Sequence, residues 1–92
     1  MAAVVRIPGL LRSYTKGEGA VVLDGLPAGA TLRDALAEID ARFPGLAFRI
    51  VDEQAAIRAQ IKIFVDAVLA RDLEVAVLPG AEIMIVGALS GG

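Results

Sequence analysis

Short runs of β-prone residues, several with apolar and polar positions in alternation, predict four strands. The runs cover residues 2–7, 20–24, 60–66 and 81–87, and turn-forming residues bound them. A further short extended piece is expected near 73–77. Because strands that follow one another in sequence usually pair, we expect the first two runs to be antiparallel neighbours.

A helical period of apolar residues is clearest over residues 31–43. The positions that share one face are Leu32, Ala35, Leu36, Ile39 and Phe43. Thr31 suits the N-cap position, and Asp34 stands where the acid of a capping box stands. Pro44 and Gly45 end the helix. Residues 46–59 predict a loop with a short helical turn.

These elements predict one α+β domain in which the main helix covers one face of a mixed sheet of four to five strands. The chain of 92 residues has room for one such domain, which we assign to residues 1–87. Residues 88–92 have no partner in this scheme, so we expect them to form a flexible C-terminal tail.

Composition excludes several classes of function. Hydrophobic residues make up 57 % of the chain, but charged residues interrupt every apolar stretch before it could span a bilayer. We therefore expect a cytoplasmic protein without a membrane partner, monomeric when free. The net charge of −2 and the aromatic content of 4 % do not favour a nucleic-acid partner.

Cysteine and histidine are both absent from the sequence. The chain therefore has no thiolate to act as a nucleophile or as a metal ligand. It also lacks histidine, which is the commonest general base in enzymes. We predict no catalytic residue and no metal site, and we expect a protein that is not an enzyme.

The chemistry is expected at the end of the chain, which reads Ala88-Leu89-Ser90-Gly91-Gly92. A diglycine has no Cβ, so it can pass through a channel that is too narrow for side chains. Its unhindered carboxylate suits close approach to a phosphoryl centre. These properties favour a carboxylate that an ATP-using enzyme activates, although a terminal Gly-Gly on its own is also compatible with a frayed end.

A series of short segments along nearly the whole chain extends this interpretation. In order they are Ile7-Pro8 with Leu11-Arg12, the helix 31–43 leading into Phe43-Pro44-Gly45-Leu46, Ile63-Phe64-Val65, Leu78-Pro79-Gly80-Ala81-Glu82-Ile83 and Ser90-Gly91-Gly92. The series resembles the ubiquitin-like sulfur carriers (MoaD/ThiS-like), which include the small subunit of molybdopterin synthase and the carriers of the thiamine and cysteine pathways. Asp66-Ala67-Val68, Pro79-Gly80-Ala81-Glu82 and Gly87-Ala88 depart from the family pattern, so no single pathway is assigned.

The resemblance implies a β-grasp fold and a carrier cycle. An E1-like enzyme would adenylate the carboxylate of Gly92 with MgATP, and a sulfur donor would convert it to a thiocarboxylate. Leu89, Ser90 and Gly91 would thread the active site of the partner. A sulfur-accepting synthase or other acceptor enzyme would then take the sulfur, and the chain itself would bind no cofactor.

Strand alternation predicts a surface for such a partner. The charged side chains of the three longest strands mark the face away from the helix, and four apolar residues should lie among them. We call this group the apolar patch: Val4, Phe64, Met84 and Val86. Exposed apolar surface rimmed by charge is typical of a protein-binding site, although scattered surface apolar residues are also ordinary.

Two other functions remain open at this stage. A ubiquitin-like modifier, joined through Gly92 to target lysines, would need the same activated tail. A plain protein-interaction domain would need no tail at all. The sequence also leaves open the pathway that receives the sulfur: molybdopterin, thiazole, cysteine, thiolated tRNA or a secondary metabolite.

Overall fold

The computed structural model describes residues 2–87. Their elements are β1 (Ala3–Arg6), the 3-10 helix η1 (Gly9–Leu11), β2 (Ala20–Leu23), α1 (Leu32–Arg42), α2 (Leu46–Ile50), β3 (Ile61–Val65), β4 (Val68–Ala70) and β5 (Glu82–Gly87). The predicted main helix and the four predicted strands are present, each within two residues of the expected bounds.

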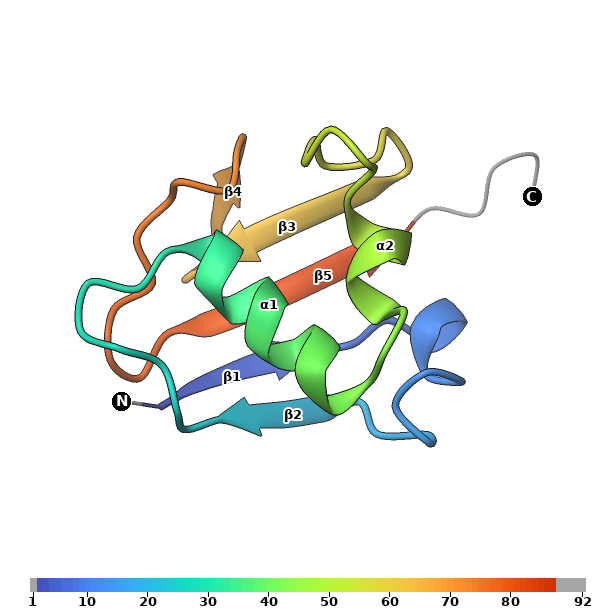
Figure 1. The fold of residues 1–92 in the computed structure, drawn as a ribbon, viewed down its shortest axis with the longest axis horizontal. Coiled ribbons are helices and arrows are strands. Elements are labelled where there is room, and N and C mark those ends of the chain that lie inside the picture. Colours follow the sequence, from blue (N-terminus) through green and yellow to red (C-terminus); the bar gives the residue numbers. More distant parts are fainter. Residues whose placement is uncertain (1, 88–92) are drawn as a thin grey trace.

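All five strands form one mixed sheet in the order β2-β1-β5-β3-β4. The pairing of β1 with β5 is parallel, and the other neighbouring pairs are antiparallel, including the expected pairing of β1 with β2. Figure 1 shows β5 in the middle of the sheet with α1 lying across it. The expected α+β, β-grasp architecture is confirmed.

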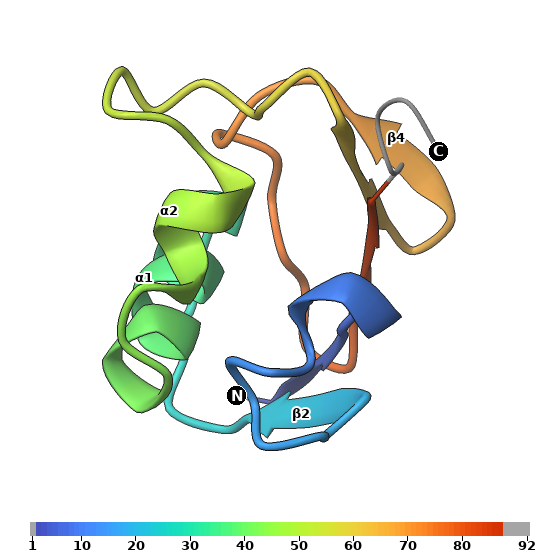
Figure 2. The same cartoon turned by 90° about the vertical axis from the view of Figure 1, so that its right-hand side faces the viewer.

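Both α-helices lie on the same face of the sheet, and the second view separates the two layers (Figure 2). The apolar face of α1 is buried as the helical period predicts, from Leu32 to Ile39, whereas Phe43 is only partly buried. Inward-facing residues of each long strand complete the core, among them Val5, Ile63, Ile83 and Ile85. Burial of this apolar surface is the main force that holds helix to sheet.

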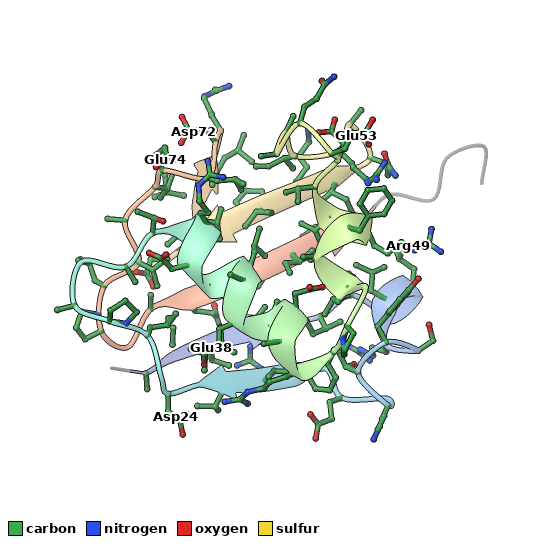
Figure 3. All side chains as sticks on the ribbon, viewed as in Figure 1. Asp24, Glu38, Arg49, Glu53, Asp72 and Glu74 are labelled. Carbon is green, nitrogen blue, oxygen red and sulfur yellow. The ribbon has the colours of Figure 1, made fainter. Side chains whose placement is uncertain are left out.

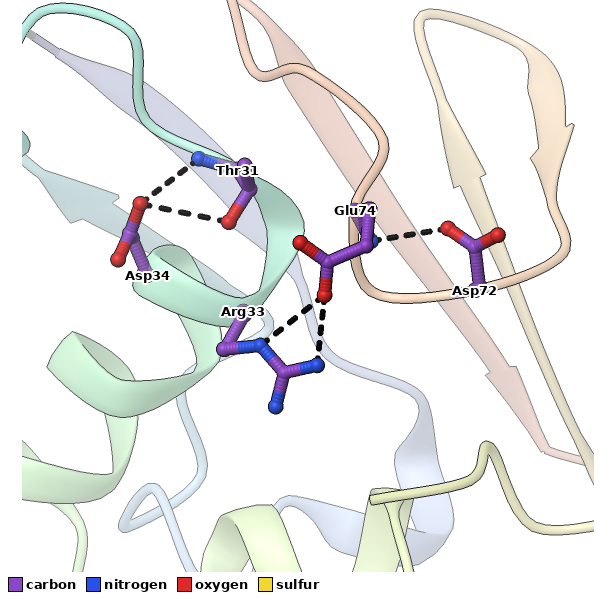
Figure 4. A network of polar contacts seen from close by, with 5 residues as sticks. All are labelled: Thr31, Arg33, Asp34, Asp72 and Glu74. Carbon is purple, nitrogen blue, oxygen red and sulfur yellow. Dashed lines mark hydrogen bonds and ion pairs between the residues drawn. The ribbon is translucent and has the colours of Figure 1, made fainter.

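The N-terminus of α1 carries the predicted cap. Thr31 is the N-cap residue, and its N–H donates to Oδ2 of Asp34 over 2.9 Å. One turn away, Nε and Nη2 of Arg33 donate to Oε2 of Glu74, and Oδ1 of Asp72 accepts the N–H of Glu74 (Figure 4). These contacts attach the start of the helix to the segment that follows β4.

The short strand was expected near 73–77, and that placement is wrong. The fourth strand is β4, five residues earlier, and 73–77 runs beside the N-terminus of α1. There the carbonyls of Val75 and Leu73 accept the first two N–H groups of α1, over 2.8 and 3.0 Å. Those N–H groups have no partner within the helix, so residues 73–77 satisfy them instead of pairing with the sheet.

The tight turn between β3 and β4 contains no glycine, yet two of its residues have a left-handed backbone conformation. Asp66 has φ of 49° and Ala67 has φ of 70°. The carboxylate of Asp66 accepts the N–H of Glu82 over 3.0 Å, and the N–H of Asp66 donates to the carbonyl of Glu82 over 2.8 Å. The turn is thereby fixed to the start of β5, although Ala67 carries a Cβ in a region that favours glycine.

We expect Ala67→Gly to raise the free energy of unfolding by about 0.5 to 1 kcal/mol, because the relief of left-handed strain exceeds the added entropy of the unfolded chain. Chemical denaturation measures this change. Ala37→Gly, at an exposed position within α1, is the matched control and should lower stability by about 1 kcal/mol. Equal destabilisation by both glycines would show that Ala67 is unstrained.

Candidate functional site

The candidate site begins where the central strand ends. Gly87 is the last residue of β5 and the last that the structure describes, so Leu89, Ser90, Gly91 and Gly92 lie outside the described residues. At this end of the strand Gly87 pairs with Ile61 of β3. A chain that leaves β5 therefore starts from a fixed point, which β3 holds by strand pairing; the pairing of β5 with β1 ends earlier, at Met84.

A side chain from η1 covers this point. A Cβ built on Gly87 would lie 2.5 Å from Cδ2 of Leu10 and 3.5 Å from Cδ1 of Ile61. Glycine therefore lets Leu10 lie against the strand, and a larger residue would displace it. The residues Pro8-Gly9 predict only a turn at this point. Two consecutive apolar residues directly after a turn, Leu10 and Leu11, were the available signal for a packed segment.

The outer face of the sheet carries the apolar patch. Val4 and Phe64 are half-buried, whereas Met84 and Val86 are each 41 % exposed. Phe64 lies directly opposite Met84 across the β3–β5 ladder, and Val86 follows on the same face toward Gly87. The structure thus brings three of the four residues together in a stripe along β5.

Val4 lies at the margin of this stripe. It pairs with Glu82 on one side and with Val22 of β2 on the other. Nε of Arg6 lies 3.1 Å from Oε2 of Glu82, so an exposed ion pair crosses the face between Val4 and Met84. The direct cross-strand apolar neighbour of Val4 is therefore Val22, not another residue of the apolar patch.

Sequence reasoning missed two exposed apolar residues of this face. Val22 is 55 % exposed and pairs with Val4, and Leu69 is 38 % exposed and pairs with Phe64. The alternation of the second strand held the signal for Val22. Leu69 escaped notice because β4 was expected at another place in the chain.

A comparison with protein-family models and one with curated proteins gave no match. Solved structures do match. A chain of the BexX/CysO complex from Amycolatopsis orientalis superposes with a TM-score of 0.86 at 30 % identity, covering 98 % of this chain and 99 % of that one. CysO from Mycobacterium tuberculosis gives 0.81 at 25 % identity, with coverage of 95 and 99 %. SAMP1 from Haloferax volcanii gives 0.84 at 23 %, with both chains fully covered.

The chain belongs to the ubiquitin-like sulfur-carrier family. The three matched proteins are small ubiquitin-like carriers or modifiers, and this chain shares that general role. The likeness to SAMP1, at lower identity, is a likeness of fold.

In this sulfur-carrier family member, a shallow groove connects the apolar patch to the end of β5. Its lining includes Pro8, Arg12, Met84, Val86 and Gly87. Nε of Arg12 donates to the carbonyl of Ile7 over 3.1 Å, which fixes the side chain at the groove wall. On the helix side, Arg49 of α2 is labelled in Figure 3, and its Nε donates to the hydroxyl of Tyr14 over 2.5 Å.

Within residues 2–87 no group of three or more acidic side chains is placed to hold a metal ion. No helix among these residues is long and apolar enough to cross a membrane. The pKa of Asp52 is lowered, chiefly because the N–H groups of Ala56 and Gln54 donate to its carboxylate. These hydrogen bonds give Asp52 a structural role in the loop that contains it.

We expect Phe64→Asp to weaken binding of an E1-like activating enzyme by about tenfold or more, because a charge would replace the ring at the centre of the patch. Isothermal titration calorimetry measures the affinity, and circular dichroism checks that the domain is folded. Leu78→Asp makes the same kind of change at an exposed apolar residue in the turn before β5 and should bind as the wild type does. Equal affinity of the two variants would remove the patch from the binding surface.

Proposed function

We propose that this protein is a sulfur carrier whose working group is the carboxylate of Gly92. In the first step a carboxylate oxygen attacks the α-phosphorus of MgATP on an E1-like enzyme, and pyrophosphate leaves. In the second step a sulfide nucleophile attacks the acyl carbon, and AMP leaves with the bonding electrons. The product is a thiocarboxylate, which donates sulfur to an acceptor enzyme in a biosynthetic pathway.

The observation that carries this proposal is the sequence Gly91-Gly92, five residues beyond the central strand of a β-grasp domain. Five extended residues reach at most about 17 Å. The carboxylate must therefore react within that distance of Gly87, so the activating enzyme must bind close to the end of β5. The apolar patch leads to that point through Val86, which supports its role as the surface that the enzyme contacts.

Membership of the sulfur-carrier family and the residue types of the chain both support the assignment. With no cysteine and no histidine in the sequence, activation and sulfur transfer are assigned to partner enzymes. The carrier contributes a fixed start for the tail, a glycine end without side chains and a surface for docking.

Incubation of the protein with an E1-like enzyme, MgATP and sulfide should raise its intact mass by the difference between a sulfur and an oxygen atom. Fragmentation in the mass spectrometer should place this gain on Gly92. A chain that ends at Ser90 is the matched control and should show no gain, because the diglycine is missing. Sulfur on the shortened chain, or no gain with the full chain across candidate enzymes, would refute the carrier proposal.

The second candidate is a protein modifier joined through Gly92 to target lysines, which the likeness of fold to SAMP1 favours. Both functions need the same activated carboxylate, and they differ in the nucleophile that displaces AMP. A modifier should give a ladder of high-mass conjugates on immunoblots of the source cells, and the ladder should disappear when Gly92 is deleted. A carrier that is not a modifier should give only the free protein in both cases.

A further inference from the structure

A second groove lies at the β4 edge of the sheet. Its lining comes from the segment that leads into β3 and from the end of β4. We call it the basic groove; the lining residues are Ile57, Arg58, Ala59, Ile61, Lys62, Leu69, Ala70 and Arg71. Ile57 and Leu69 supply partly exposed aliphatic surface, three side chains are basic, and no acidic residue from the described part of the chain lines it.

The groove is basic although the chain has a net charge of −2. Three other basic residues, Arg6, Arg33 and Arg42, form ion pairs with carboxylates. Within residues 2–87, by contrast, Lys62 and Arg71 form no ion pair. Lys62 and Arg71 both line this groove, and like charges repel, so an external anion bound there would relieve that repulsion.

Arg58 is held in place at the groove by contacts that leave part of its guanidinium free. Its Nε donates to the carbonyl of Phe48 over 2.8 Å, and Cζ lies 4.7 Å from the centre of the Phe48 ring. These contacts order the side chain before any ligand binds, which lowers the entropy cost of binding. Asp52 lies close enough for Arg58 to contribute to its lowered pKa, although the Asp52 carboxylate already accepts two backbone N–H groups.

The acidic residues next to Arg71 along the chain also have internal partners. Asp72 accepts the N–H of Glu74 over 2.9 Å, and Glu74 in turn binds Arg33 at the start of α1. Both carboxylates are labelled in Figure 3, above the start of α1. Neither lines the basic groove.

The basic groove adjoins the apolar patch along two strand pairs. Leu69, at the groove rim, lies opposite Phe64, and Lys62 lies opposite Val86. A protein seated on the patch would therefore reach the groove without leaving the same side of the sheet.

We propose that the basic groove binds an acidic segment of a protein partner, in which carboxylates flank an aliphatic side chain. The aliphatic residue would contact Ile57 and Leu69, and the carboxylates would pair with the basic side chains of the groove. The contacts with Ile57 and Leu69 distinguish this ligand from a small inorganic anion, which would gain nothing from apolar contact. The proposal goes beyond the activation of Gly92, since that chemistry does not require the groove.

The test is a titration of the full-length ¹⁵N-labelled protein, followed by NMR. The probe is the blocked peptide acetyl-Asp-Glu-Leu-Glu-Asp-amide. We expect amide shifts confined to residues 57–62 and 69–71. The amide analogue with Asn and Gln, the analogue with Ser in place of Leu, and inorganic phosphate should all bind more weakly at the same residues.

Two double variants separate a specific groove from general attraction. Lys62→Gln with Arg71→Gln should weaken peptide binding about fivefold, as expected for the loss of two exposed ion pairs. Lys16→Gln with Arg49→Gln removes the same charge outside the groove and should change the affinity little. Equal loss in both variants, shifts spread over all basic surfaces, phosphate binding as tight as the peptide, or no shifts at all would each overturn the proposal.

The outcome is independent of the proposed function. The titration uses no ATP, no activating enzyme and no residue beyond Gly87. A chain that ends at Ser90 should therefore bind the peptide normally while it gains no sulfur. Peptide binding without sulfur transfer by the full chain would count against the carrier proposal alone, and the reverse result would count against the groove alone.

Discussion

The pairing of β5 between β1 and β3 is the constraint on which the rest of the structure depends. Parallel β1–β5 contact joins the first and last strands of the described chain, and Ile83 and Ile85 bury the inner side of β5 in the core. Without this pairing the sheet would separate into two hairpins, each too small to be stable alone. The pairing with β3 also fixes the position of Gly87, the residue from which the distance available to residues 88–92 is counted.

Side chains alternate between the two faces of the sheet along each strand, so the inner face and the outer face have different roles. Inward side chains pack against α1 and α2 and supply most of the stability, while Phe64, Met84 and Val86 add little to the core. A face that is not needed for folding is available to bind other proteins. The outer face combines this apolar stripe with a basic margin at β4, so a complementary partner would be apolar at its centre and acidic at one edge.

The architecture was predictable from sequence because each element carries a strong local signal. The helix has a full apolar period with its cap at Thr31, and the strands alternate, so even the outer positions of Phe64 and Met84 were predicted correctly. The misplaced strand shows where such reasoning stops. Asp66-Ala67 lacks the glycine that marks a tight turn. The carbonyls of Leu73 and Val75 accept helix N–H groups instead of joining the sheet, which is a tertiary effect. The basic groove forms where the segment before β3 meets the end of β4, so it could not be predicted while β4 was expected at another place in the chain.

The central place of β5 also determines how the domain would respond to a pulling force. A load applied at Gly87 acts along the strand, parallel to both neighbouring ladders, so the hydrogen bonds to β1 and β3 share it and must shear together. At an edge strand pulled sideways, they would instead open one after another. A protein gripped by this end should therefore resist mechanical unfolding, which would matter whenever an unfoldase engages it there.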